Sequence, residues 1–393
     1  MRAADLLPLN MAASADSDRP QRILVRGVNW LGDAVMTTPA LRRLREAHPR
    51  AHIALLTAAK LADLWNHHPH IDQVLTFGPG ESVFAVARHL RTLDFDTALI
   101  LPNSPRSALE AFLALIPRRI GHARPWRNWL LTERVAPRAA ETPMRKRTAA
   151  EIQRLITAEP ARTHAAQLTS EAHHIHQYLN LVAALGAVAD PVAPHLAVTE
   201  AEIEAFCRRF EFPRSASPRP LLLGINAGAE YGPAKRWPRE RFIETALQVQ
   251  AKTGCRCWIF GGPAEVEFAQ SLADAIAKVG PPDSVSCVAG QTSLRELCAA
   301  LKACDVVLTN DSGPMHVAAA VGTPVIVPFG STSPALTAPG LPGDPRHQLL
   351  QSDAPCSPCY RRECPIDFRC MTGLSVERVV VAVLKHLTNA SPP

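Results

Sequence analysis

The chain lacks any long uninterrupted run of apolar residues. A helix that crosses a bilayer needs about 20 consecutive, mostly apolar residues, and no stretch of the 393 residues approaches that length. Residues 1–20 contain only the short apolar run Leu6-Leu7-Pro8-Leu9, too short for the centre of a secretory signal. We therefore expect a cytoplasmic protein, with residues 1–20 as a disordered tail and Met11 as an alternative start.

The sequence also lacks the two common fingerprints of nucleotide-binding loops. The G-x-G-x-x-G spacing is absent, and no glycine loop carries the Gly-Lys-Ser/Thr of a P-loop. Aromatic residues make up only 5% of the chain, whereas hydrophobic residues reach 47% and charged residues 20%. This balance is typical of a globular protein with a large core, and the length favours two domains.

Short β-branched runs alternate with helical stretches, which predicts a parallel sheet built from βαβ units. The runs expected as strands are Ile23–Val25, Ile53–Leu56, Val74–Leu75, Thr97–Leu101, Leu221–Ile225, Cys257–Phe260, Val285–Val288, Asp305–Leu308 and Val325–Val327. A Pro- and Ser-rich segment interrupts the alternation. We expect an α/β protein with an N-terminal domain over 21–212, a linker over 213–220, and a C-terminal domain over 221–393, each doubly wound and facing the other across a cleft.

The first strand runs into the loop Gly27-Val28-Asn29-Trp30-Leu31-Gly32-Asp33. Backbone N–H groups at such a strand–loop–helix junction bind anions. Here, however, an acid follows Gly32 where a phosphate-binding lysine would stand, which favours a base facing a hydroxyl group. The alternative is that Asp33 only caps its helix.

Two further loops follow strands in the second half. The run Gly224 to Pro238 joins a glycine-rich turn to the adjacent cations Lys235 and Arg236, a combination suited to a diphosphate. The run Phe260 to Glu265 ends on a carboxylate that could accept hydrogen bonds from ribose hydroxyls or from an adenine amine, or could simply lie at the surface.

The most specific motif is Thr309-Asn310-Asp311-Ser312-Gly313-Pro314-Met315-His316, between a strand and a helix. The start of that helix offers free N–H groups and a positive dipole end to a diphosphate. Asp311 can bond sugar hydroxyls and Ser312 can cap the helix. His316, one turn further on, either faces the same site or packs in the core.

Positive charge is concentrated between Arg118 and Arg147, where nine basic residues stand against Glu133 and Glu141. Such a surplus favours an anionic partner, for instance a membrane surface, although charge runs are often only solvated. A nucleic acid is disfavoured because no aromatic residues are interleaved in the manner of nucleic-acid-binding surfaces.

Four of the ten cysteines cluster near the C-terminus, at positions 356, 359, 364 and 370. Four thiols this close could hold a structural zinc or iron ion. The neighbouring Arg361, Arg362 and Arg369 suit instead a loop that faces a substrate, and both alternatives stay open. The other six cysteines stand in apolar stretches and are expected to be reduced core residues.

The chain resembles the lipopolysaccharide heptosyltransferases, glycosyltransferase family 9, from about residue 22 to residue 387. The resemblance rests on the stretches Asn29–Asp33, Leu101–Ser104, Ser107–Leu109, Ile116–Pro117 with Gly121, Gly228–Pro238 and Asn310–Ala319. The run Gly-Pro-Ala-Lys-Arg-Trp-Pro within them is long and unusual.

This resemblance implies a GT-B fold, with the acceptor bound by the first domain and ADP-L-glycero-β-D-manno-heptose by the second. It implies inversion at the anomeric centre with no metal ion or other cofactor. Asp33 stands at the position of the family's general base. The residues expected on the donor side are Lys235, Glu265, Asp311, Ser312, Gly313 and His316; those expected on the acceptor side are Asn29, Asn103, Arg118 and Arg119.

The acceptor implied is the lipid A-linked inner-core oligosaccharide, met by peripheral docking at the inner membrane. The second heptose, added to heptosyl-Kdo2-lipid A, is favoured over the first. A transferase of the same fold with another nucleotide sugar, a sugar-nucleotide 2-epimerase and, outside enzymes, a basic nucleic-acid-binding protein are the alternatives.

Overall fold

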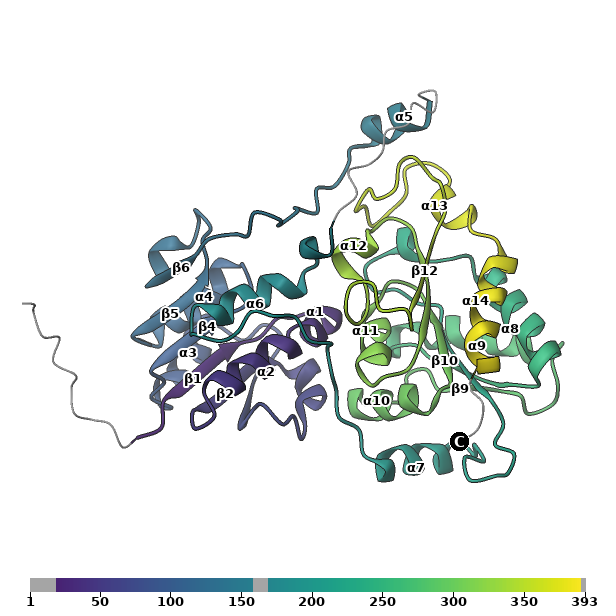
Figure 1. Ribbon diagram of the computed structural model, residues 1–393, viewed down its shortest axis with the longest axis horizontal. Helices are drawn as coiled ribbons and strands as arrows, with labels where there is room; N and C mark the ends of the chain where they lie inside the picture. Colours follow the sequence, from purple (N-terminus) through teal and green to yellow (C-terminus); the bar gives the residue numbers. More distant parts are fainter. Residues whose placement is uncertain (1–18, 158–168, 390–393) are drawn as a thin grey trace, which may run out of the picture.

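The computed structural model describes residues 19–157 and 169–389 of the chain. The predicted N-terminal tail, apart from its last two residues, lies outside the described residues, as does Met11. Two six-stranded sheets, all of whose strands pair in parallel, form the body of the molecule (Figure 1). The expected pair of doubly wound α/β units is therefore confirmed.

The first sheet has the strand order β3-β2-β1-β4-β5-β6. Its strands are β1 (Arg22–Arg26), β2 (His52–Ala58), β3 (Gln73–Phe77), β4 (Thr97–Ile100), β5 (Arg118–His122) and β6 (Glu133–Val135). The helices of this half are α1 (Leu31–Met36), α2 (Thr38–Ala47), α3 (Val83–Arg91), α4 (Pro105–Leu113) and α6 (Ile175–Ala183).

The second sheet repeats the arrangement, with the order β12-β11-β10-β7-β8-β9. Its strands are β7 (Leu222–Asn226), β8 (Arg256–Ile259), β9 (Val285–Cys287), β10 (Val306–Thr309), β11 (Val325–Phe329) and β12 (Gln348–Gln351). The helices of this half are α7 (Glu200–Arg209), α8 (Arg239–Thr253), α9 (Val266–Ala277), α10 (Leu294–Ala303), α11 (Gly313–Ala320), α12 (Pro334–Thr337), α13 (Arg369–Thr372) and α14 (Val376–Asn389), while α5 (Ala149–Thr157) lies apart (Figure 1).

The central strands are apolar on both faces because helices cover both sides of each sheet. In β1, Ile23 and Val25 belong to the core that includes α2 and α6, whereas Leu24 between them packs with residues of α3 and α4. Side chains of successive strand residues point to opposite faces. This is why the strands read in the sequence as short continuous apolar runs.

Each run predicted as a strand coincides with or overlaps one, but β5, β6 and β12 were not anticipated. These three strands carry few β-branched apolar residues: β5 reads Arg-Arg-Ile-Gly-His and β6 reads Glu-Arg-Val. β6 and β12 lie at sheet edges, where one side of the strand is unpaired and alternation is weak. Part of the basic run over residues 118–147 therefore forms the strand pair β5–β6.

The chain crosses between the sheets more than once. Residues 136–148 run from β6 to α5 beside the second sheet, and α6 then returns to pack on α2 of the first (Figure 1). Helix α7, which we had assigned to the N-terminal domain, packs on α10 of the second sheet instead. We therefore propose residues 187–198 as the connection between the domains, before α7 rather than after it.

The two sheets meet through the helices that follow β1 and β10. Helices α1 and α11 lie side by side between the sheets (Figure 1). A Cβ atom on Gly32 would stand 2.6 Å from His316 Cδ2, and one on Gly313 would stand 2.9 Å from Leu31 Cβ. Two glycines without side chains thus permit this contact. Among the described residues, no helix is both long and apolar enough to cross a bilayer.

Candidate active site between the two sheets

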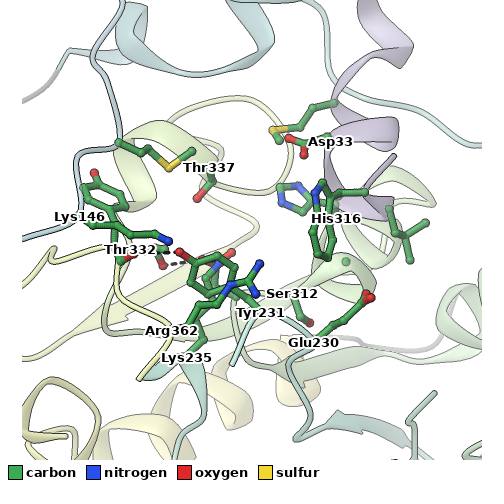
Figure 2. Close-up of a pocket in the computed structure, with 18 residues that line it drawn as sticks. Asp33, Lys146, Glu230, Tyr231, Lys235, Ser312, His316, Thr332, Thr337 and Arg362 are labelled. Carbon is green, nitrogen blue, oxygen red and sulfur yellow. Dashed lines mark hydrogen bonds and ion pairs between the residues drawn. The ribbon is translucent and has the colours of Figure 1, made fainter. Parts of the chain in front are cut away.

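A cavity of about 370 Å³ opens where α1 faces α11, and both halves of the chain line it (Figure 2). From the first half come Gly32, Asp33, Met144 and Lys146; from the second come Glu230, Tyr231, Lys235, Asp311, Ser312, Gly313, His316, Thr332, Thr337, Tyr360 and Arg362. In an open α/β sheet, ligands bind at the carboxyl ends of the strands. The cavity lies at those ends of both sheets.

Asp33 is the third residue of α1, whose N-cap is Trp30. The helix-cap alternative therefore does not describe it. Its carboxyl group faces the cavity from the first half, opposite the loops of the second (Figure 2). Tyr178 of α6 donates a hydrogen bond to it from behind.

Burial raises the pKa of Asp33 to about 6, against the opposing effects of Lys235 and of the Tyr178 hydrogen bond. A carboxyl group with this pKa is ionised at neutral pH yet is a stronger base than an exposed aspartate. Efficient general-base catalysis needs a pKa close to the working pH. The environment of Asp33 therefore suits proton abstraction.

Lys235 and Asp311 form a nearly buried ion pair on the second wall of the cavity. Lys235 Nζ lies 2.6 Å from Asp311 Oδ2, and the Thr332 hydroxyl donates to the same oxygen at 2.5 Å (Figure 2). Lys235 also lies over the ring of Tyr231, 4.9 Å from its centroid. The ammonium group is thus fixed beside the start of α11, where free N–H groups favour an anion.

Asn310 holds the two loops of this wall together. Its side chain accepts from Trp237 N at 2.9 Å and donates to Ala227 O at 2.8 Å, bridging the ends of β10 and β7. Ser312 occupies the N-cap of α11 without a capping hydrogen bond; its hydroxyl instead accepts from Asn226 at 3.2 Å. The N–H groups at the start of α11 therefore stay available for a ligand.

The loop over residues 354–364 supports the Lys235 loop from outside. Tyr231 donates to Tyr360 O at 2.9 Å, and Ala234 N donates to Arg362 O at 2.9 Å. Gly232 adopts a φ of 149°, and a Cβ there would stand 2.6 Å from Arg362 O. Only glycine fits this approach without displacing the loop.

His316 is buried, and its ring lies against Gly32 at the edge of the cavity. Burial lowers its pKa to about 4, an effect that exceeds the opposing influence of Asp311. A neutral imidazole at pH 7 can donate or accept a hydrogen bond but brings no positive charge. The two alternatives for His316 are therefore both met, since its ring is buried and also lines the cavity.

A second cavity of about 220 Å³ adjoins the first and shares Leu31, Glu230, Ser312 and Gly313 with it. Glu265 lines this second cavity. One of its oxygens accepts from Gly262 N at 3.1 Å, while the other is buried without a partner among the described residues. An unpartnered buried acceptor is costly unless a ligand satisfies it, so this carboxylate suits a hydroxyl donor.

The structure brings together all the residues expected on the donor side, across the two adjoining cavities. The residues expected on the acceptor side fare differently. Asn29 accepts from Arg26, and Asn103 accepts from the buried Arg127; neither lines the cavity.

Arg118 and Arg119 are the first two residues of β5 and lie at its amino-terminal end, whereas the cavity lies at the carboxyl ends of the strands. Arg118 is paired with Glu133, and Arg119 donates to the carbonyl groups of Leu130 and Ile116. Because their side chains hold the fold and lie at the opposite end of the strand, we do not carry them forward as acceptor-binding residues.

The basic run as a whole is more neutral than its composition indicates. Besides the pair of Arg118, ion pairs join Arg124 to Glu141, Arg138 to Glu171 and Arg145 to Glu151. Arg127 is fully buried. Our expectation of a concentrated positive surface was wrong in this respect, since two of these partners lie outside the acidic residues we had counted.

The four clustered cysteines are reduced, as are the other six. Cys356 and Cys359 pack with Ile152 of α5 and with Ile366. No group of three or more His, Cys, Asp or Glu side chains within residues 19–157 and 169–389 is arranged to hold a metal ion. Of the neighbouring arginines, Arg362 lines the cavity, as the substrate-facing alternative predicted.

Sequence reasoning missed Tyr178 and the position of Lys146. Tyr178 lies within an ordinary amphipathic helix, so no local signal marks it. Lys146 looked like one more residue of the basic run. Lys146 lines the cavity only because of the path that residues 136–148 take, and the sequence pattern does not predict that path.

A model of glycosyltransferase family 9 (heptosyltransferase) matches residues 83–368. The chain is 31% identical over 327 residues to lipopolysaccharide heptosyltransferase 2 of Escherichia coli (strain K12), covering 81% of this chain and 85% of that protein. It is 27% identical over 330 residues to lipooligosaccharide heptosyltransferase 2 of Haemophilus ducreyi, covering 81% and 86%.

Solved structures agree in fold. The E. coli ADP-heptose lps heptosyltransferase II superposes with a TM-score of 0.72 at 25% identity, covering 94% of this chain and 99% of that one. The glycosyl transferase family 9 protein from Veillonella parvula gives a TM-score of 0.74 at 23% identity, covering 94% and 98%. The expected GT-B fold is confirmed.

We predict that Asp33 titrates with a pKa of about 6 and that Tyr178→Phe raises this value further, because the variant loses a hydrogen bond that favours the carboxylate. The measurement is a ¹³C NMR titration of the carboxyl groups, with the Asp33 signal assigned by its loss in Asp33→Asn. A midpoint near 4 in the wild type, or no upward shift in Tyr178→Phe, would contradict this account of the site.

Proposed function

Because the chain belongs to glycosyltransferase family 9, the heptosyltransferases, we propose that it transfers L-glycero-D-manno-heptose from ADP-heptose to the inner core of lipopolysaccharide. Relatives named heptosyltransferase 2 favour addition of the second heptose, onto heptosyl-Kdo2-lipid A. The protein would work on the cytoplasmic side of the inner membrane, where its donor is made available.

One observation supports the chemistry most directly. A carboxylate with a raised pKa and a fixed Lys–Asp pair occupy facing walls of a single cavity. Asp33 takes the proton of the acceptor hydroxyl group while the oxygen of that hydroxyl attacks the anomeric carbon. The new glycosidic bond forms as the bond from that carbon to the phosphate oxygen breaks, on the opposite face, so the configuration inverts.

The departing ADP carries additional negative charge, which two fixed groups stabilise. Lys235 lies beside the start of α11, and the free N–H groups of that helix point to the same region. The smaller cavity accepts the nucleoside, with the unpartnered oxygen of Glu265 directed to a ribose hydroxyl. The diphosphate then spans Ser312 and Gly313, which line both cavities.

The alternatives differ in what they require. An epimerase acts on a nucleotide sugar alone and has no use for a base on a separate acceptor domain. A transferase of another nucleotide sugar would use the same walls, so only substrate trials separate it from a heptosyltransferase.

Contact with the membrane needs side chains other than the ion-paired arginines of the basic run, Arg118, Arg124, Arg138 and Arg145. Trp126 and Trp129 are 55% and 66% exposed in the connection between β5 and β6, and Trp129 packs edge-on against Phe112. Arg134 of β6 lies nearby, and the only hydrogen bond described for its side chain is to the Asn128 carbonyl. Tryptophan favours the bilayer interface, and arginine favours anionic head groups. We propose this surface as the peripheral contact.

We predict that the wild type releases ADP from ADP-heptose only when heptosyl-Kdo2-lipid A is present. Asp33→Asn should reduce transfer by roughly 10²–10⁴, the usual contribution of a general base, while ADP binding by calorimetry stays near the wild-type value. Lys235→Ala should instead weaken ADP binding itself. Release of ADP with Kdo2-lipid A but not its heptosylated form would assign the first heptose instead, and release without any acceptor would contradict transfer.

For the membrane surface, we predict that Trp126→Ser combined with Trp129→Ser reduces sedimentation with liposomes containing anionic phospholipid, because both indoles leave the interface. Phe84→Ser is the matched control, since Phe84 is 73% exposed on α3, away from this connection. Equal sedimentation of the double variant and the control would place membrane contact elsewhere.

A further inference from the structure

Residues 136–148 form a strap that carries part of the first half across to the second. Its end is anchored on the cysteine-containing loop of residues 354–364. Arg147 N donates to Cys359 O at 3.0 Å, and Arg361 donates to Arg147 O at 3.0 Å. Ile152 of α5 then packs in one cluster with Cys356 and Cys359. The strap is therefore fixed in place directly beside the cavity.

The neighbouring cations Arg145 and Lys146 on the strap differ in exposure and in their partners. Arg145 is paired with Glu151 at 2.7 Å, has a side chain 66% exposed and does not line the cavity. Lys146 lines the cavity and has no ion pair among the described residues. Figure 2 shows it on the far side of the cavity from Asp33. The anchored strap thus directs one positive charge into the site.

Arg362 adds a second cation from the opposite anchor. It lines the same cavity, and its guanidinium lies 5.2 Å from the centroid of the Tyr231 ring. Like Lys146, it has no carboxylate partner in the described parts of the chain. Lys235, by contrast, forms an ion pair with Asp311. Two cations that form no ion pair within the described residues, on the same side of one cavity from the Lys235 loop to the strap, favour an anionic ligand.

We propose that Lys146, together with Arg362, binds an anionic group of the acceptor and thereby selects acidic inner-core substrates. This inference rests on the proposed function. Neither residue lines the smaller, nucleotide-type cavity, and the heptose being transferred carries only hydroxyl groups. Lys146 also belongs to the half of the chain that supplies Asp33, the residue that faces the acceptor hydroxyl.

A carboxylate of an acidic sugar and a phosphate monoester on the core are the two sources of such an anion. Both accept hydrogen bonds from ammonium and guanidinium groups. Loss of a hydrogen bond between charged groups lowers affinity by about 10- to 100-fold when the site is partly shielded from water.

The experiment compares Lys146→Ala, Lys146→Arg and Arg145→Ala with the wild type. We expect Lys146→Ala to raise the KM for heptosyl-Kdo2-lipid A by about 10- to 100-fold, with kcat and the calorimetric Kd for ADP changed by less than about twofold. Lys146→Arg should restore most of the affinity because it keeps the charge. Arg145→Ala should behave as wild type because its side chain faces solvent.

Two outcomes would overturn the proposal. An unchanged acceptor KM in Lys146→Ala would leave the residue without a role in acceptor binding. A weakened Kd for ADP in the same variant would assign the cations to the donor diphosphate. Failure of the wild type to transfer heptose would instead contradict the proposed function, so the two failures are distinguishable.

The source of the anion is identified by repeating the comparison with a modified acceptor. If treatment with a phosphatase removes the difference between wild type and Lys146→Ala, the group is a phosphate. If methyl esterification of the acidic sugars removes it, the group is a carboxylate. A difference that survives both treatments would contradict recognition of an anion.

Discussion

The close contact between α1 and α11 is the constraint on which the site depends. These helices follow the central strands of two separate sheets, and they approach only because Gly32 and Gly313 leave room for His316 and Leu31. The contact sets Asp33 of one half opposite Lys235 and Asp311 of the other. The proposed base and the proposed donor-binding groups come from different halves of the chain, so their spacing is set by this contact rather than by either half alone.

The same contact sets the electrostatics of the cavity. Asp33 is shielded from water strongly enough to raise its pKa to about 6, although Lys235 and Tyr178 oppose the shift. The ion pair with Asp311 holds the Lys235 ammonium group in place beside the start of α11. Lys146 and Arg362 add two cations that form no ion pair with any carboxylate of the described residues. The acceptor hydroxyl, the leaving group and an acceptor anion thus meet three different environments in one cavity.

Much of this arrangement could be predicted from the sequence. Within residues 19–157 and 169–389, apolar runs located nine of the twelve strands. The glycine-rich loops after them located Asp33, Lys235, Glu265 and Asp311, since functional loops follow the carboxyl ends of parallel strands. The strands β5 and β6 escaped because their polar residues pair with each other, as Arg118 does with Glu133. The charge of Arg118 and Arg119 was the signal for placing them on the acceptor side, but the sequence does not show that Arg118 pairs with Glu133 or that Arg119 donates to backbone carbonyl groups.

What the sequence could not predict depends on the path of the chain between elements. Residues 136–148 carry no periodic pattern, yet their anchoring at Cys359 and Arg361 places Lys146 in the cavity. Likewise, Tyr178 reaches Asp33 only because α6 returns to pack on α2. Such contacts are set by tertiary packing between distant segments and leave no local signature.

The most direct test of the central claim is transfer by Gly32→Ala, with Gly78→Ala as control because a Cβ at Gly78 would meet nothing closer than 3.9 Å. An added methyl group at Gly32 would stand 2.6 Å from His316 Cδ2, so either α1 or the His316 ring must shift. Misplacement of a reacting group by about 1 Å can reduce the rate about 100-fold. We predict a loss of heptose transfer of that order with wild-type ADP affinity. Transfer at the wild-type rate would contradict the account.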